Sequence, residues 1–229
     1  MTRAWVLPAG LAVVLLAWNN VVVAAVPHGA YVAVSAAATV VLLAVARASG
    51  LTWAQLGLAR RHIRAGLRWG GAAFALVAAG CAVAVLIPSL RPLFIDARTA
   101  GLDGGELLTR VLLRIPVGTV LWEEVAFRGV LLAVLARVLP LRRAVLSSAA
   151  VFGLWHVRPT VSGLAVNGLA EDPWSRAAAV ALVCLATAAA GLLFSWLRLR
   201  SGSLLAPVLL HLATNVLGTV AAVTAGRLS

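Results

Sequence analysis

Long apolar segments separated by short polar connections recur along the whole chain. Most approach the roughly 20 residues that an α-helix needs to cross the hydrocarbon core of a bilayer. The expected spans are 5–26, 31–46, 69–90, 106–137, 144–157 and 177–197, and a seventh that begins at residue 203. This pattern predicts an all-α fold, a polytopic transmembrane helical bundle of about seven spans, with residues 1–229 as a single membrane domain.

The connections between these spans carry weaker patterns. Residues 51–58 read as a short amphipathic helix lying on the membrane surface. Residues 158–174 are rich in Gly, Pro and Asn, and we expect a loop there that gates substrate entry. Glu106, Arg110 and Arg114 are spaced four apart, which predicts an ion-pair ladder at the outer end of the fourth span.

Small and amide residues inside the spans predict helix contacts. Gly66 and Gly70 form a small-xxx-small pair, which is typical of closely packed membrane helices. Asn19 and Asn20 are expected to form hydrogen bonds between helices.

The composition excludes an ordinary soluble domain. Hydrophobic residues make up 62% of the chain and charged residues 11%, with a mean hydropathy of +1.02, whereas soluble domains have roughly 25% charged residues. The net charge is +12, but the arginines follow the connections and form no basic stripe, so we expect no nucleic-acid partner. Cys81 and Cys184 lie alone in apolar segments and are expected to be unpaired.

The arginines predict the orientation in the bilayer. We assign eleven to the side of the N-terminus: Arg3, Arg47, Arg60, Arg61, Arg64, Arg68, Arg137, Arg142, Arg143, Arg198 and Arg200. Five fall on the other side: Arg91, Arg98, Arg158, Arg176 and Arg227. Because arginine is enriched in cytoplasmic connections, we expect a multi-pass protein of the cell membrane with a cytoplasmic N-terminus.

The fourth span contains an acidic pair followed by an arginine, Glu123, Glu124 and Arg128. A charge at the centre of a membrane helix costs about 2.5 to 3.5 kcal/mol, so such residues usually have partners and a function. Glu124 and Arg128 stand at i and i+4 and are expected to pair, which leaves Glu123 free. The alternative is an ion-pair cluster that only holds helices together.

Two histidines on later spans fall at similar depth. His156 follows Phe152 by four residues, and His211 precedes Asn215 by four. Counted inward at about 1.5 Å per residue, Glu123, His156 and His211 lie about 12 to 20 Å from the cytoplasmic ends of their helices. We therefore expect one polar chamber that faces the cytoplasm. A histidine in an apolar helix is also commonly a packed, hydrogen-bonded residue.

A glutamate, two histidines and an asparagine are suited to activating water and stabilising an oxyanion. This chemistry favours hydrolysis of an acyl bond. One alternative is a proton-coupled membrane carrier, because Glu and His residues also relay protons. Another is a non-catalytic membrane immunity or partner protein with the same fold.

Three motifs in this order carry a resemblance: Glu123-Glu124-x-x-x-Arg128, Phe152-x-x-x-His156 and His211-x-x-x-Asn215. They resemble the CAAX prenyl protease and bacteriocin-processing family of intramembrane endopeptidases. The matching context extends over residues 122–215, which would be the catalytic core.

The resemblance implies a protease that cleaves a peptide bond near or within the bilayer. It implies that Glu123 and His156 activate water and that His211 and Asn215 stabilise the oxyanion. Glu124, Arg128 and Phe152 would support them. The implied partners are the lipid bilayer and a peptide or membrane-protein substrate, with or without an attached lipid. We expect no cofactor; the alternative is Zn²⁺ held by Glu123, His156 and His211.

Overall fold

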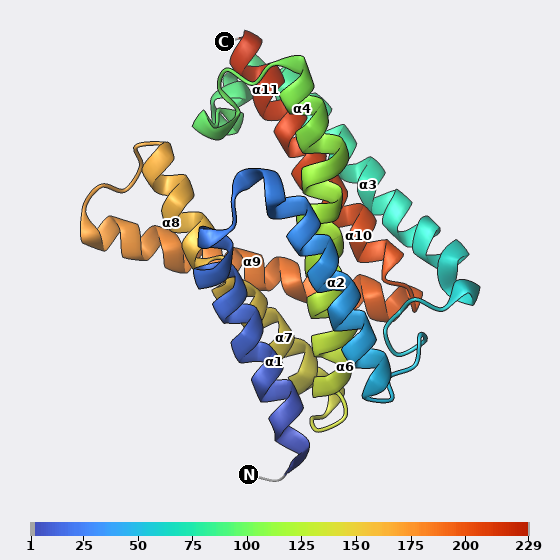
Figure 1. The fold of residues 1–229 in the computed structure, drawn as a ribbon. Coiled ribbons are helices and arrows are strands. Elements are labelled where there is room, and N and C mark those ends of the chain that lie inside the picture. Colours follow the sequence, from blue (N-terminus) through green and yellow to red (C-terminus); the bar gives the residue numbers. More distant parts are fainter. Residues whose placement is uncertain (1–2, 229) are drawn as a thin grey trace.

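The computed structural model describes residues 3–228, which form helices and turns without a β-strand (Figure 1). The predicted all-α class is confirmed. By length and composition, five helical stretches are able to cross a membrane: Val6–Ala25, His28–Ala48, Arg60–Leu86, Pro173–Ser201 and Leu205–Leu228. The protein is therefore a multi-pass membrane protein, and the expected total of about seven spans stays a prediction.

The α-helices follow one another along the chain with short connections. They are α1 (Val6–Ala17), α2 (Tyr31–Ala48), α3 (Ile63–Leu86), α4 (Gly104–Thr109), α5 (Trp122–Glu124), α6 (Leu132–Leu135), α7 (Leu141–Trp155), α8 (Val157–Val166), α9 (Pro173–Ser201), α10 (Leu205–Leu212) and α11 (Gly218–Leu228). Wider π-helical turns form η2 (Trp18–Val22), η8 (Arg110–Leu121), η9 (Val125–Leu131) and η10 (Ala213–Leu217). Tight 3₁₀ turns form η1 (Arg3–Trp5), η3 (Val23–Ala25), η4 (His28–Ala30), η5 (Arg60–His62), η6 (Pro88–Phe94) and η7 (Ala97–Thr99).

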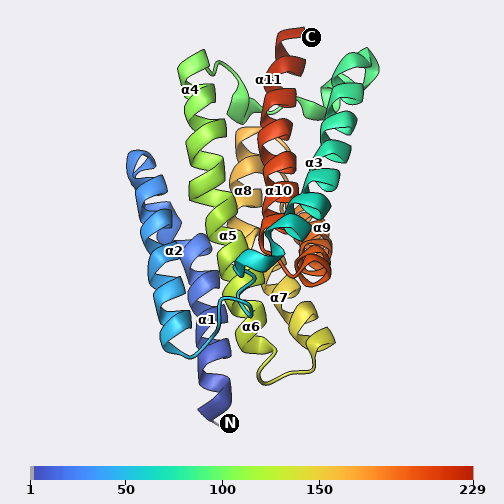
Figure 2. The same cartoon turned by 90° about the vertical axis from the view of Figure 1, so that its right-hand side faces the viewer.

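One continuous helix, from α4 through η8, α5 and η9 to α6, forms the centre of the bundle (Figures 1 and 2). Its middle is buried on all sides, and the hydrophobic core gathers around Val125, Phe127 and Leu131. π-Helical turns are uncommon and frequently occur at functional sites. Here they flank both sides of the acidic pair.

This helix begins with a capping box. The Asp103 carboxylate accepts from the Glu106 backbone N–H, and the Glu106 carboxylate accepts from the Asp103 backbone N–H. Arg110 donates instead to the carbonyl of Arg98, at 2.7 Å. The predicted ladder of Glu106, Arg110 and Arg114 is therefore wrong, because the acidic member is used at the helix terminus.

The contact between α3 and α10 depends on two glycines. A Cβ added to Gly66 would lie 2.6 Å from the Ser203 hydroxyl, and one added to Gly70 would lie 2.9 Å from the backbone of Ala206. Real Cβ atoms do not approach other atoms so closely. The predicted small-xxx-small contact is confirmed.

Two predicted connections differ from the structure. Residues 51–58 form consecutive turns and no helix, and the side chains of Leu51 and Leu56 are completely buried. The interfacial helix is therefore wrong: the segment forms turns, and two of its leucines pack into the protein, whereas Trp53 and Leu58 are exposed. Part of the expected loop at 158–174 is also wrong, since Val157–Val166 forms α8.

The buried turns at 51–58 are held by a side chain from the other end of the sequence. Arg198 of α9 donates to the carbonyls of Ala54 and Gln55. Leu204 donates through its backbone N–H to the carbonyl of Gly57, at 2.8 Å. These long-range contacts replace the lipid surface that the sequence pattern predicted.

Candidate active site

A buried ion-pair network joins the central helix to α10. The Arg128 guanidinium donates to the Glu124 carboxylate at 3.0 Å, and both side chains are at most 1% exposed. The same oxygen, Oε1 of Glu124, lies 2.8 Å from Nδ1 of His211. The predicted Glu124–Arg128 pair is confirmed, and Glu124 additionally orients the His211 ring.

Aromatic rings and a glycine enclose the Arg128 guanidinium. It lies 3.9 Å from the ring centre of Phe152 and 4.8 Å from that of Phe194. Gly191 of α9 leaves room for it, because a Cβ there would lie 3.2 Å from Nη2. The rings and the single carboxylate together compensate a charge that burial would otherwise make costly.

Glu123 has a different environment from its neighbour. Its Oε1 accepts a hydrogen bond from the indole N–H of Trp155, at 3.1 Å. Its Oε2 is buried and has no hydrogen-bond partner, and it lies 3.9 Å from Nε2 of His211. A buried carboxylate oxygen without a donor is available to a ligand.

His156 lies at the junction of α7 and α8. Its Nδ1 lies 2.8 Å from the carbonyl of Phe152, which only accepts, so Nδ1–H is the donor. In a neutral ring this leaves the lone pair on Nε2. The ring also packs edge-on against Phe152, with centroids 4.7 Å apart, so the expected packing role of Phe152 is confirmed.

Asparagines from the first helical stretch hold this junction in place. Asn19 donates to the carbonyl of Trp155 at 2.8 Å, and Asn20 accepts from the backbone N–H of Arg158 at 3.1 Å. The predicted contacts between helices through Asn19 and Asn20 are confirmed. They fix the position of the segment that carries both Trp155 and His156.

A cavity of about 910 Å³ connects these groups. Glu123, His156 and Asn215 all line it, although they come from α5, the α7–α8 junction and η10. His211 lies behind Glu123 and reaches the site through its Nε2. The structure thus brings all four candidate residues to one place.

Trp155 was not identified from the sequence as part of the site. It is only 2% exposed, and its N–H is the single donor to Glu123. The sequence feature that could have identified Trp155 is its position directly before the candidate histidine His156. Phe194 had no comparable signal, because its approach to Arg128 depends on how α9 packs.

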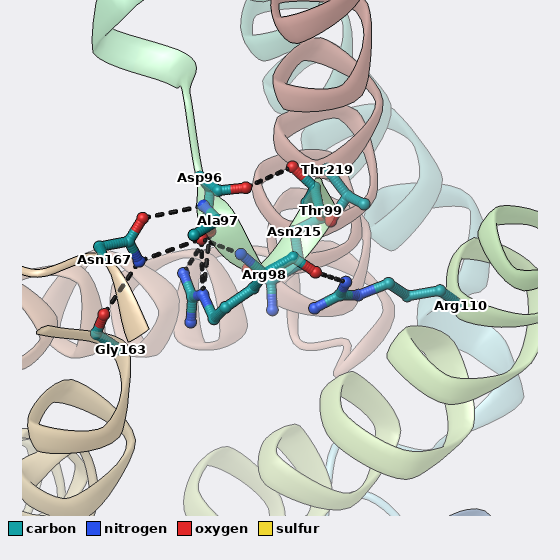
Figure 3. A network of polar contacts seen from close by, with 9 residues as sticks. All are labelled: Asp96, Ala97, Arg98, Thr99, Arg110, Gly163, Asn167, Asn215 and Thr219. Atoms are coloured by element: carbon teal, nitrogen blue, oxygen red, sulfur yellow. Dashed lines mark hydrogen bonds and ion pairs between the residues drawn. The ribbon is translucent and has the colours of Figure 1, made fainter. Parts of the chain in front are cut away.

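Polar contacts tie together the segments at the mouth of the cavity (Figure 3). Arg98 binds both oxygens of the Asp96 carboxylate, and Asn167 at the end of α8 donates to the same carboxylate at 3.2 Å. Ala97 returns a backbone hydrogen bond to Asn167 at 2.9 Å. The Arg98 hydrogen bonds lower the pKa of Asp96 to about 2, so this carboxylate is charged at neutral pH.

The mouth lies at the end of the molecule that is remote from the N-terminus. In Figures 1 and 2 the first residues of α1 are at one end, and the start of α4 and the C-terminus are at the other. The segment 96–99 at the mouth precedes α4.

The residues do not gather as a metal site. Within residues 3–228 no three His, Cys, Asp or Glu side chains are placed to hold one ion. In the alternative zinc set, His156 uses Nδ1 on a carbonyl, and His211 uses Nδ1 on Glu124. These contacts leave Nε2 of both rings as the possible ligand atom, as is usual for zinc-binding histidines, so the zinc alternative stays a prediction. Cys81 and Cys184 are unpaired, as expected.

Comparison with known families agrees with the motifs. Residues 105–217 match the family model described as "Type II CAAX prenyl endopeptidase Rce1-like". The matched segment contains every candidate site residue and about half of the chain. Through this segment the protein belongs to the CAAX protease family of intramembrane endopeptidases. No curated protein and no solved structure matches the chain.

Proposed function

We propose that this protein is an intramembrane endopeptidase that hydrolyses a peptide bond with water activated by Glu123 and His156. The observation that carries the proposal is the unpaired Oε2 of Glu123, buried beside a cavity that His156 and Asn215 also line. A carboxylate oxygen without a donor is free to accept a proton from a bound water, as a general base does.

In the proposed reaction, water binds between Glu123 Oε2 and His156 Nε2. Glu123 takes a proton from the water, and the oxygen of the water adds to the carbonyl carbon of the peptide. The tetrahedral intermediate then collapses, the C–N bond breaks, and the proton passes to the departing amine nitrogen. Trp155 holds the other oxygen of Glu123, so the carboxylate keeps one orientation throughout.

His211 and Asn215 would stabilise the negative charge that develops on the carbonyl oxygen. In its protonated form, His211 donates from Nδ1 to the Glu124 carboxylate and presents Nε2–H to the site. The side-chain amide of Asn215 supplies a second donor. Removing one such donor typically lowers kcat about 10²- to 10³-fold.

The substrate class follows from the family and from the cavity. The family name refers to prenylated CAAX sequences, in which a cysteine near the C-terminus carries the lipid. We propose a peptide or a membrane-protein tail, with or without such a lipid, that enters from the bilayer side. Metal-free water activation is part of this proposal.

For the orientation we give priority to the arginine distribution, eleven against five. The N-terminus is then cytoplasmic, and a chamber that faces the cytoplasm is part of the same proposal. Reporter fusions at each terminus test it, and an extracytoplasmic N-terminus contradicts it.

The test of the function compares cells that carry the native chain with cells that carry Glu123→Ala or His156→Ala. Mass spectrometry of membrane and secreted peptides should show products that disappear in both variants. Glu171→Gln is the matched control, because this exposed carboxylate does not line the cavity. Normal products in both variants contradict the proposal, and pH-driven uptake of uncleaved peptide would indicate a carrier.

A further inference from the structure

The wall of the cavity has more positive than negative charge. Four arginines line it, namely Arg98, Arg110, Arg114 and Arg158, against two carboxylates, Asp96 and Glu123. The Asp96 carboxylate is already bound by Arg98. The other three arginines outnumber the one remaining carboxylate of the lining, that of Glu123.

None of the ion pairs formed within residues 3–228 includes Arg110, Arg114 or Arg158. Their contacts are with neutral groups. Arg110 donates to the Arg98 carbonyl, and Arg158 donates to the Asn20 carbonyl at 3.3 Å.

Arg114 lies over the face of Tyr31, with 5.1 Å from Cζ to the ring centre. A ring and a carbonyl orient a guanidinium but do not neutralise it.

Two of these arginines are close together on the same helix. Arg110 and Arg114 are four residues apart in η8, and both line the cavity. Like charges at this spacing destabilise a helix. Figure 3 shows the Arg110 side chain extending from η8 to the segment that carries Arg98.

We propose that Arg110 and Arg114, assisted by Arg158, form an anion-binding subsite that recognises a carboxylate of the peptide substrate. The guanidinium group presents paired N–H donors that match a carboxylate. A bound carboxylate would remove the repulsion between the two arginines. It would also orient the peptide along the cavity that leads to Glu123 and His156. This subsite deepens the proposed protease function and rests on it.

The occupant is a peptide carboxylate, and two sources supply it: the free C-terminus or the side chain of Asp or Glu. One test peptide, prepared in three forms, separates them. The first form has a free C-terminal carboxylate, the second a C-terminal amide, and the third the amide together with an aspartate at the last position. All three carry an S-prenylated cysteine and a fluorophore, and the full-length protein is reconstituted in nanodiscs of neutral lipid.

The native protein should bind and cleave the free-carboxylate form with KM or Kd about tenfold lower than the amide form. A tenfold ratio corresponds to about 1.4 kcal/mol. Arg110→Gln and Arg114→Gln should reduce the ratio to about one. Arg114→Lys should keep part of the native preference for the free-carboxylate form. Restoration of tight binding by the aspartate form would assign the subsite to acidic side chains.

Arg227→Gln is the matched control, because Arg227 is exposed near the same end of the molecule and does not line the cavity. It should keep the native ratio. Equal losses for all peptide forms in Arg114→Gln would mean a structural role and overturn the subsite. A second set of nanodiscs contains added anionic lipid. The subsite would also be overturned if the effect of these variants on Kd depended on the anionic lipid and not on the peptide carboxylate.

Binding is measured separately from cleavage, so the two proposals fail differently. A protein that prefers the carboxylate form but cleaves none of the peptides retains the subsite and loses the protease function. One that cleaves all three forms with equal KM and binds them equally retains the function and loses the subsite.

Discussion

The same ion pair, a guanidinium with a carboxylate, occurs in two regions with different consequences. In the bundle centre, Glu124 and Arg128 are at most 1% exposed. At the cavity mouth, the side chains of Asp96 and Arg98 are 23% and 53% exposed. Water screens the second pair and not the first. The buried pair is therefore costly to break and orients His211, whereas the mouth pair contributes little energy and positions a connection.

The largest effect is expected from breaking the central pair. Arg128→Met should destabilise the folded protein by about 3 to 5 kcal/mol, because Glu124 is left as a buried charge with His211 as its only partner. Unfolding in detergent, followed by circular dichroism, measures this. Changing both Glu124 and Arg128 to apolar residues should recover much of the lost stability. If it does not, the unpaired buried charge of Glu124 is not the cause of the loss.

Glu123→Gln should affect activity more than stability. The substitution keeps the shape of the side chain and removes the proposed base, so kcat should fall about 10²- to 10⁴-fold. The unfolding midpoint should remain near the native value, since Oε2 has no partner to lose. A variant that retains native turnover would remove Glu123 from the proposed mechanism.

Trp155→Phe should have an intermediate effect. It keeps an aromatic ring in the core and removes the indole N–H that holds Glu123. A hydrogen bond to a charged group contributes about 1.5 to 3 kcal/mol, so we expect roughly a tenfold or greater decrease in kcat. Native kcat in this variant would mean that the indole only packs.

Asp96→Asn at the mouth should have the smallest effect, no more than about 1 kcal/mol. The pKa of Asp96 is about 2 in the folded state, below its ordinary value of 3.8. Its stabilisation is therefore present above about pH 4 and is lost as the pH falls toward 2. Unfolding midpoints of the native and Asn forms should converge in that range. A large difference between the two unfolding midpoints at pH 2 would mean that the Asp96–Arg98 pair is not the source of the stabilisation.

The motifs and the helical pattern predicted much of the candidate site. The i, i+4 spacing of Glu124 and Arg128 was sufficient to predict their pair, because neighbouring turns of one helix place them together. The close approach at Gly66 and Gly70 was predicted from their small size and their spacing on one helix, which are also local features. The connections were predicted less well. Residues 51–58 have an amphipathic pattern, but Arg198 from α9 binds their carbonyls and holds them inside the protein.

By itself, the amino-acid sequence determined the helical membrane class, the unequal neighbours Glu123 and Glu124, and the family of the segment 105–217. These follow from composition, helical period and local motifs, which act over a few residues. Only the tertiary structure decided that Glu124 also binds His211, that Trp155 holds Glu123, and that Glu123, His156 and Asn215 line one cavity. Those contacts join residues far apart in the chain, and they depend on how the helices pack.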